Sequence, residues 1–502
     1  MKTPLRRSIA LARSPETLLK GFVVLGTLLY LRQYLFNRSL WLDECMLSVN
    51  LMDCSIRQML CQPLPKYLQA APFMFCAIEK LAISIGGASE YVLRLYPLVC
   101  GICSLWLFAK TAPMFLSRWL AVLAMAIFVC TPELAYFASE VKPYGGDVAA
   151  TLIVLFAVGH AAPDDLDWRS VLGLALLGVG MVWLSFPSVF VLAGVGGTRL
   201  VEAWIRRWRS ASIRWSLVAS AWSASFVAYF IVSLRNVAHV QGPIPYWNAG
   251  YVGFAAGQTP WAIWFRMLRN PMHFTTTAGL VTALFLIGVC AFWREDKRKL
   301  FVLAGPILLV FAASALRLYS CMDRMMLFLA PLFILLVVRG IQRTADKPLA
   351  AVLLFAFACG ASLTTTWQRW CRPLEREEIR TVLARVQPQV QPGDVLYVYP
   401  RATPHFAYYG ARFGMEMLPM ISGRSWTNNQ ACFAEDVMPL FGQRRAWLLF
   451  AHIDRTAGRT DDAFCKDYLQ RAGGRLLSEH RAPQACAYLF DLSKVGSALP
   501  AD

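Results

Sequence analysis

Residues 277–293, with the sequence TAGLVTALFLIGVCAFW, decide the fold because they form an apolar run without a charged side chain. The run ends at a basic segment, Arg294 to Lys299, and a second apolar stretch follows over residues 300–316. An α-helix needs about 20 apolar residues to cross the hydrocarbon core of a bilayer. Because the apolar residues are continuous and do not alternate with polar ones, they favour membrane helices over strands of a membrane barrel.

The same pattern recurs along the chain. Of its 502 residues, 57% are hydrophobic and only 16% are charged, which disfavours a soluble enzyme, a disordered chain and a fibrous protein. We therefore predict an α-helical polytopic membrane protein with about eleven transmembrane helices. The predicted spans are residues 18–36, 91–109, 119–136, 144–161, 170–185, 187–203, 213–234, 277–293, 300–316, 325–340 and 348–366.

Positive charges set the expected orientation. Lys and Arg accumulate in alternate loops, which explains the net charge of +18 without a nucleic-acid partner. The segments rich in Lys and Arg contain Lys2, Arg6, Arg7, Arg13, Lys20, Lys110, Arg118, Arg169, Arg199, Arg206, Arg207, Arg209, Arg214, Arg294, Lys297, Arg298, Lys299, Arg339, Arg343 and Lys347. We predict that these loops and the N-terminus are cytoplasmic. An odd number of spans then places residues 367–502 outside, in the periplasm if the chain lies in the inner membrane of a bacterium.

The C-terminal residues change composition sharply. Short apolar runs at 394–399, 446–450 and 487–490 predict buried strands, and the segments 375–386, 434–441 and 461–471 predict helices. We therefore expect a transmembrane domain over residues 1–366 and a small extracytoplasmic α/β domain over residues 367–502. His405 and His452 stand alone in the sequence of this domain and are expected to be ordinary structural residues, and its cysteines allow one or two disulfides.

Asp43 and Glu44 form the first of two acidic sites on the predicted outer side. They follow the first span within the segment Ser39-Leu-Trp-Leu-Asp-Glu44. A carboxylate near hydrocarbon is costly and is kept where it is paired or used. Burial and mutual repulsion raise the pKa of one member of such a pair, which suits a general base near neutral pH. The alternative interpretation is that Asp43 or Glu44 caps the following helix.

The second acidic site is Glu140, which lies with Lys142 and Tyr144 in the outer turn Tyr136-Phe-Ala-Ser-Glu-Val-Lys-Pro-Tyr144. A solvated ion pair is the plainer interpretation, but the connection is short and apolar. Further side chains on the same predicted side could bind the phosphate and headgroup of an anionic lipid: Lys66, Tyr67, Arg94 and Arg324.

These motifs resemble one superfamily in their order along the chain. Trp41-Leu-Asp-Glu44, the Pro-rich segment 62–67, Ser89-Glu-Tyr-Val-Leu-Arg94 and Ser139-Glu-Val-Lys-Pro-Tyr144 resemble those of integral-membrane glycosyltransferases with the GT-C fold. The likeness is to the branch of protein O-mannosyltransferases and bacterial aminoarabinose transferases, and it covers roughly residues 20–345. Asp323-Arg324 also fits, although Met325 stands where the family usually has tyrosine.

The resemblance implies a polyprenyl-phosphate-linked sugar as donor, a lipid, glycan or protein of the cell envelope as acceptor, and transfer at the outer face of the membrane. It further implies that Asp43 is the catalytic base, with Glu44 as its neighbour and substitute. Glu140 matches the acidic position of the second loop, where it orients a substrate. Single displacement with one carboxylate base would invert the anomeric centre.

Three alternatives remain open at this stage. A transporter or flippase of lipid-linked sugars would carry carboxylates near the bilayer midplane and internal repeats. A ligase for a preassembled glycan would share the donor chemistry, and a non-catalytic assembly protein would use the tail for docking. The family sometimes uses a divalent cation, but no His, Asp or Glu spacing in this sequence requires one, so we predict no metal ligands.

Overall fold

The computed structural model describes residues 14–62, 64–162, 164–237, 245–253, 257–345, 348–424, 430–456 and 458–495. The chain forms two compact units. The first comprises Met1–Phe36 and Cys54–Pro373, and the second comprises Asn37–Asp53 and Leu374–Asp502. A short segment after the first helix therefore belongs with the C-terminal residues, whereas the predicted division between residues 366 and 367 left that segment in the membrane domain.

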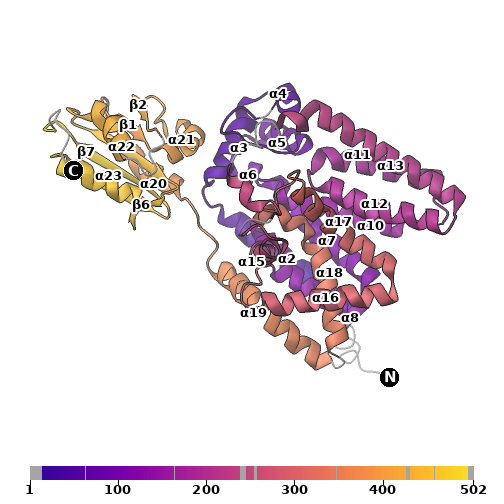
Figure 1. Ribbon diagram of the computed structural model, residues 1–502. Coiled ribbons are helices and arrows are strands. Elements are labelled where there is room, and N and C mark those ends of the chain that lie inside the picture. Colours follow the sequence, from indigo (N-terminus) through magenta and orange to yellow (C-terminus); the bar gives the residue numbers. More distant parts are fainter. Residues whose placement is uncertain are drawn as a thin grey trace, which may run out of the picture. The chain divides into compact units, whose positions relative to one another are not determined.

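The first unit is a bundle of helices (Figure 1). Its short helices are α4 (Ile56–Cys61), α5 (Phe73–Gly86), α6 (Glu90–Leu93), α9 (Pro132–Phe137), η1 (Phe230–Leu234), η2 (Pro245–Gly250), α15 (Pro260–Arg269) and η3 (Asp323–Leu329). Its longer helices are α2 (Pro15–Phe36), α7 (Leu95–Phe115), α8 (Arg118–Cys130), α10 (Tyr144–His160), α11 (Trp168–Leu184), α12 (Ser188–Ile205), α13 (Arg209–Tyr229), α16 (Ala278–Glu295), α17 (Lys297–Ala315), α18 (Ala330–Thr344) and α19 (Pro348–Cys371).

The apolar helices coincide with the predicted spans. In the described part of the chain, eight helices are long and apolar enough to cross a membrane, and α8, α10 and α11 are shorter apolar helices. Each predicted span overlaps one of these helices, which confirms a mostly helical chain with membrane-spanning segments. The number of eleven crossings stays a prediction, because α8 has 13 residues, while α10 and α11 have 17 each and lie at the lower end of the length that a crossing requires.

One predicted span is divided in two. The sequence analysis treated residues 119–136 as one helix, but α8 ends at Cys130 and α9 begins at Pro132. Proline lacks a backbone N–H and disfavours helical geometry in the residue before it, so it ends one helix and starts the next. The break leads the chain into the turn that carries Glu140.

Helix α18 lies at the centre of the first unit, and nearly all of its side chains from Ala330 to Ile341 are buried. It crosses α16 at very short range through two glycines. A Cβ on Gly288 would collide with the carbonyl oxygen of Leu336, and a Cβ on Gly340 would collide with that of Leu284. Small residues allow such close approach between helices in a membrane protein. The crossing is therefore specified by Gly288 and Gly340.

We expect Gly340→Ala to destabilise the first unit, because its methyl group meets the backbone of α16 and the two helices must move apart. Overpacking of this kind costs about 1–3 kcal/mol. Thermal unfolding of the full chain in detergent measures the effect. Gly279→Ala is the matched control, because it lies on α16 with nothing within 4 Å of its added methyl group. Equal midpoints for the two variants would contradict the prediction.

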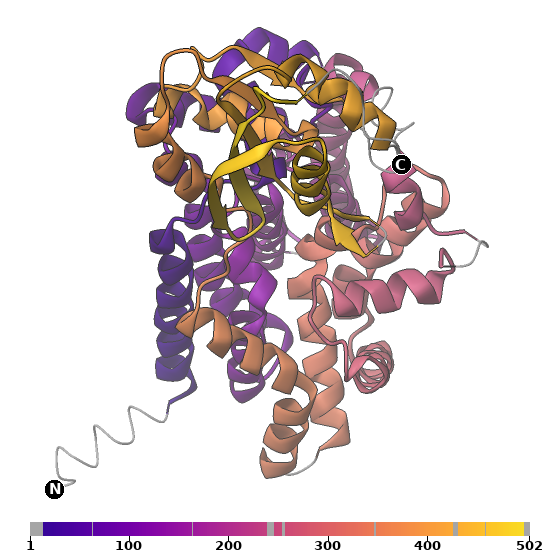
Figure 2. The same cartoon turned by 90° about the vertical axis from the view of Figure 1, so that its left-hand side faces the viewer.

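The second unit is built on a five-stranded sheet in the order β2-β1-β3-β7-β6, drawn as orange and yellow arrows in Figure 2. Strands β1 (Val395–Val398), β2 (Met420–Ser422) and β3 (Ala446–Ala451) are parallel, whereas β7 (Ala485–Asp491) is antiparallel to both β3 and β6 (Arg475–Ala482). Strand β3 is buried along its whole length, and β7 is buried up to its last residue. The core of the unit therefore lies around these two strands.

The remaining elements surround this sheet. They are α3 (Leu42–Asp53), α20 (Ile379–Val386), η4 (Gln387–Gln389), η5 (Pro400–Ala402), α21 (Thr403–Tyr409), η6 (Ala411–Phe413), α22 (Gln430–Val437), η7 (Met438–Leu440), the hairpin β4 (Arg455–Thr456) and β5 (Arg459–Thr460), and α23 (Asp461–Arg471). The three predicted strands and three predicted helices are present, so the α/β class is confirmed. The helix expected from residue 375 begins only at Ile379. In the C-terminal part, Cys371, Cys465 and Cys486 are free thiols, whereas the side chain of Cys432 lies outside the described residues.

Candidate active site

The segment that carries Asp43 and Glu44 folds as part of the second unit. Helix α3 begins at Leu42 and packs against α21, more than 300 residues further along the chain. Asp43 is partly exposed in the first turn of α3, whereas the side chain of Glu44 is fully buried. The two adjacent carboxylates therefore have different environments, and Asp43 is the more accessible one.

Glu44 is held by two contacts at the start of α3. Its Oε2 lies 3.7 Å from Nη2 of Arg38, whose side chain is also fully buried. The same oxygen accepts the backbone N–H of Trp41 at 3.3 Å, as the glutamate of a capping box does. Glu44 thus caps the helix, which is one of the two roles that the sequence offered for this acidic pair. Its catalytic role as a substitute for Asp43 stays a prediction.

The backbone N–H groups that lead into α3 all find side-chain acceptors. In the order Ser39 to Leu42, these acceptors are Glu378 at 3.2 Å, the Tyr409 hydroxyl at 2.9 Å, Glu44, and Glu377 at 2.7 Å. The amino end of a helix leaves such groups without partners inside the helix. Three of the four acceptors come from the C-terminal part of the second unit, so that part fixes the backbone just before Asp43.

Glu377 joins two histidines that the sequence analysis regarded as isolated. His405 Nε2 lies 2.7 Å from Glu377 Oε2, and His452 Nδ1 lies 2.6 Å from Glu377 Oε1. Burial by itself raises the pKa of Glu377, but the hydrogen bonds and charges of the two histidines outweigh burial and lower this pKa to about 2. The two histidines, which stand alone in the sequence, therefore both contact one buried carboxylate in the fold.

The second acidic turn lies in the first unit, between α9 and α10. The side chain of Glu140 is completely buried, and that of Lys142 is 5% exposed. Lys142 donates from Nζ to Oε1 of Gln69 at 2.8 Å, and its backbone N–H donates to the carbonyl of Glu140 at 2.7 Å. The Lys142–Gln69 contact joins the turn to a residue two positions after the Pro-rich segment, 73 residues earlier in the chain.

The loop that carries Gln69 is pinned in a strained conformation. Leu64 and Gln69 form an isolated antiparallel bridge, and between them Tyr67 and Leu68 have φ angles of 59° and 50°. Non-glycine residues in this left-handed region cost of order 1–3 kcal/mol each and cluster at ligand sites. Lys66 is exposed and Tyr67 is half-buried. Pro63, also part of the predicted motif, lies outside the described residues.

Three further predicted residues lie in the first unit. The Arg324 guanidinium sits 5.6 Å from the ring centroid of Tyr144, within the range of a cation–π contact. Arg94 is 1% exposed and precedes the first turn of α7. That turn packs against the start of α10, where a Cβ on Gly145 would lie 3.6 Å from the carbonyl oxygen of Pro97. Arg94 therefore lies at the same end of the bundle as the turn that carries Lys142.

The sequence analysis missed two buried carboxylates in the first unit. Glu79 in α5 is fully buried with no hydrogen-bond partner on either oxygen, and Asp147 in α10 is buried with no partner on Oδ1. A carboxylate inside an apolar helix is itself a signal of a functional or paired group. The missed signals were Glu79 within Ala-Ile-Glu-Lys-Leu and Asp147 within Gly-Gly-Asp-Val.

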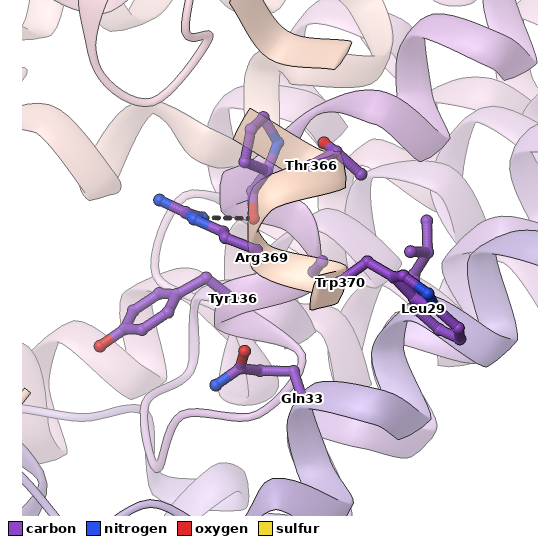
Figure 3. Close-up of a pocket in the computed structure, with 8 residues that line it drawn as sticks. Leu29, Gln33, Tyr136, Thr366, Arg369 and Trp370 are labelled. Atoms are coloured by element: carbon purple, nitrogen blue, oxygen red, sulfur yellow. Dashed lines mark hydrogen bonds between the residues drawn. The ribbon is translucent and has the colours of Figure 1, made fainter. Parts of the chain in front are cut away.

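A small hollow opens between α2, α9 and α19 (Figure 3). It is lined by Gln33, Tyr136, Arg369 and Trp370 among others. Arg369 lies 3.0 Å from Glu133 and donates to the carbonyl of Pro132, the contact that is dashed in Figure 3. Because Glu133 compensates its charge, Arg369 is not a strong candidate for binding a phosphate here.

The predicted site residues fall into two groups. Asp43 and Glu44 belong to the second unit, whereas Glu140, Lys142, Tyr144 and the other four substrate-binding candidates belong to the first. That both acidic sites lie on the outer side of the membrane stays a prediction. No group of three or more His, Cys, Asp or Glu side chains that could hold a metal ion occurs within the described ranges.

Comparison with solved structures identifies the fold. ArnT from Cupriavidus metallidurans bound to undecaprenyl phosphate is 12% identical with a TM-score of 0.53, covering 96% of this chain and 98% of ArnT. Apo ArnT from the same organism is 12% identical with a TM-score of 0.54, and the match covers 94% of this chain and 98% of ArnT. The archaeal oligosaccharyltransferase AglB from Archaeoglobus fulgidus is 11% identical with a TM-score of 0.49, and the match covers 86% of this chain and 69% of AglB. No family model and no curated protein matches the sequence. The ArnT likeness confirms the GT-C-like fold that the motifs predicted, and the chain is an integral membrane protein.

Proposed function

We propose that this chain is a membrane glycosyltransferase that moves a sugar from a polyprenyl-phosphate-linked donor to a lipid, glycan or protein of the cell envelope. The proposal places the reaction at the outer face of the inner membrane of a bacterium, with the N-terminus cytoplasmic and the second unit periplasmic. The observation that carries it is the Lys142–Gln69 contact, which connects the second acidic turn, through a buried cation, to the loop that begins with the Pro-rich segment. The near-complete ArnT-like fold supports it, since that ArnT binds undecaprenyl phosphate.

The chemistry needs one base and several cations. The acceptor hydroxyl or amine attacks the anomeric carbon of the donor sugar while the bond from that carbon to the phosphate oxygen breaks. The carboxylate of Asp43 takes the acceptor proton, a step worth roughly 10²–10⁴-fold in rate. The phosphate leaves as an anion, so cations that bind it stabilise the transition state. A single displacement inverts the anomeric centre.

The first unit supplies the candidates for donor binding. Lys142, Arg94 and Arg324 are the cations proposed to bind the lipid phosphate, with Lys66 at the exposed tip of its loop. Tyr144, which stacks with Arg324, and Tyr67 are proposed to contact the donor beside them. Glu140, buried two residues from Lys142, is proposed to orient the acceptor or the donor.

We expect Lys142→Met to raise the KM for a polyprenyl-phosphate sugar by about 10–100-fold, because a charge-assisted hydrogen bond to phosphate is worth about 1.5–3 kcal/mol. The measurement is release of polyprenyl phosphate by the purified chain in detergent. The matched control is Lys110→Met, since Lys110 is exposed near the other end of α7.

Two outcomes would contradict the proposal. If the wild-type chain releases no polyprenyl phosphate from any lipid-linked sugar in the presence of envelope acceptors, the reaction is not a glycosyl transfer from such donors. If Lys142→Met and Lys110→Met have equal KM values for the donor, Lys142 does not bind the phosphate.

A further inference from the structure

Three consecutive residues of the second unit hold the segment in front of Asp43. The Arg376 guanidinium lies 3.7 Å from the ring centroid of Trp41, Glu377 accepts the backbone N–H of Leu42, and Glu378 accepts from Ser39. The hydroxyl of Ser39 donates to Glu378 Oε2 at 2.8 Å as well. These three residues therefore contact Ser39, Trp41 and Leu42, which lead into the first turn of α3.

Among these contacts, that of Glu377 lies nearest to Asp43. Leu42 is the first residue of α3 and the immediate neighbour of Asp43, and its N–H lies 2.7 Å from Glu377 Oε2. A carboxylate at a helix amino end is favoured by the helix dipole, and a charge-assisted hydrogen bond is roughly twice as strong as a neutral one. The position of Glu377 thus sets the position of the backbone from which Asp43 projects.

His405 and His452 fix Glu377 in turn. Each carboxylate oxygen has its own imidazole partner, so the carboxylate can neither rotate nor shift without breaking a bond. The Glu377 side chain is only 6% exposed and that of His405 is fully buried, whereas that of His452 is 28% exposed. The arrangement runs from His452 at the surface, through Glu377, to the helix that carries Asp43.

We propose that Glu377, held by His405 and His452, is a positioning residue that sets the orientation of Asp43 for proton transfer. The inference rests on the proposed function, in which Asp43 is the base. A displacement of about 1 Å in a reacting group is enough to lower a rate 10²-fold. Because the donor-binding candidates lie in the other unit, a loss of positioning affects turnover and leaves donor affinity unchanged.

The alternative explanation is that Glu377 only stabilises the fold, and the second unit contains a matched control for it. Asp394 is also completely buried, and it accepts from Trp447 Nε1 at 2.8 Å and from Arg445 Nε at 2.7 Å. These partners anchor β1 to β3, and none of them belongs to α3. Asp394→Asn therefore removes a buried, hydrogen-bonded carboxylate from the same unit without touching the segment of Asp43.

The test compares Glu377→Gln, Asp394→Asn and Asp43→Asn in the full chain, with turnover normalised to folded protein. An amide accepts hydrogen bonds at one end only, so at least one donor to Glu377 loses its acceptor. We expect kcat of Glu377→Gln to fall about 10–100-fold with the donor KM within twofold of wild type. Folded Asp394→Asn should keep wild-type kcat.

His452→Asn keeps the test decisive if Glu377→Gln does not fold, because it removes one support of Glu377 at the surface, and we expect about a 3–10-fold loss of kcat. The deciding variant is Glu377→Gln if it folds, and otherwise His452→Asn. If Asp43→Asn is inactive and the deciding variant has wild-type kcat, the positioning role is overturned. An equal loss of kcat in folded Asp394→Asn would also overturn it. Full activity of Asp43→Asn would instead overturn the proposed base.

Discussion

Asp43→Asn is expected to lower kcat by roughly 10²–10⁴-fold, the contribution of a positioned general base, while the chain remains folded. The asparagine side chain has nearly the shape of aspartate but cannot take the proton of the attacking acceptor. Asp43 is partly exposed, so the amide of the variant keeps access to solvent. Steady-state release of polyprenyl phosphate measures kcat, and thermal unfolding in detergent checks the fold.

The control for this variant is a second partly exposed carboxylate of the same unit. Asp454 pairs with Arg401 at 2.8 Å and lies outside the contacts that hold α3. We expect Asp454→Asn to keep wild-type turnover. If Asp43→Asn retains the kcat of Asp454→Asn, Asp43 is not the base, and the assignment of the first acidic site fails.

Glu44→Gln is expected to give the opposite result: the free energy of unfolding falls, whereas kcat per folded molecule is largely kept. The variant leaves the buried guanidinium of Arg38 without the carboxylate that lies 3.7 Å from it. Breaking a buried ion pair by removal of one partner costs about 3–5 kcal/mol. For a unit of this size, such a loss lowers the unfolding midpoint by about 10 °C or more. Proteolysis of the second unit as a function of temperature measures the midpoint.

The turnover of folded Glu44→Gln separates the two adjacent carboxylates. We expect the kcat per folded molecule to stay within tenfold of wild type at a temperature where the variant is intact. A variant with the wild-type midpoint and no turnover would make Glu44 the base and Asp43 its neighbour. Together, the Asp43 and Glu44 variants decide which of two adjacent residues carries the chemistry.

The helices of the first unit were predictable because a bilayer imposes one strong condition, a long continuous apolar stretch. The predicted span 119–136 shows the limit of that argument. Hydropathy is continuous across Pro132, but the backbone is not, because a proline N1 position starts a new helix. Likewise, the close crossing of α16 and α18 requires that Gly288 and Gly340 each lie against the backbone of the other helix, and composition does not encode this placement.

In the second unit, the central strands were predictable and the edge strands were not. Strands β1, β3 and β7 are short buried apolar runs. By contrast, β6 has the sequence RLLSEHRA and alternates between exposed and partly buried side chains, and β2 has only three residues. An edge strand pairs through its backbone on one side, so its side chains carry little of the signal.

The sequence by itself determined a helical membrane chain, a C-terminal α/β unit, and the residues worth testing, because hydropathy and motif order are properties of the linear chain. Only the tertiary structure decided that α3 folds with residues beyond 374, that Glu44 is buried against Arg38, and that Glu377 connects Leu42 with His405 and His452. The contact of Glu377 with Leu42 alone joins residues 335 positions apart. Whether a carboxylate is exposed, paired or fixed depends on what packs around it, and neighbours in space are set by the fold.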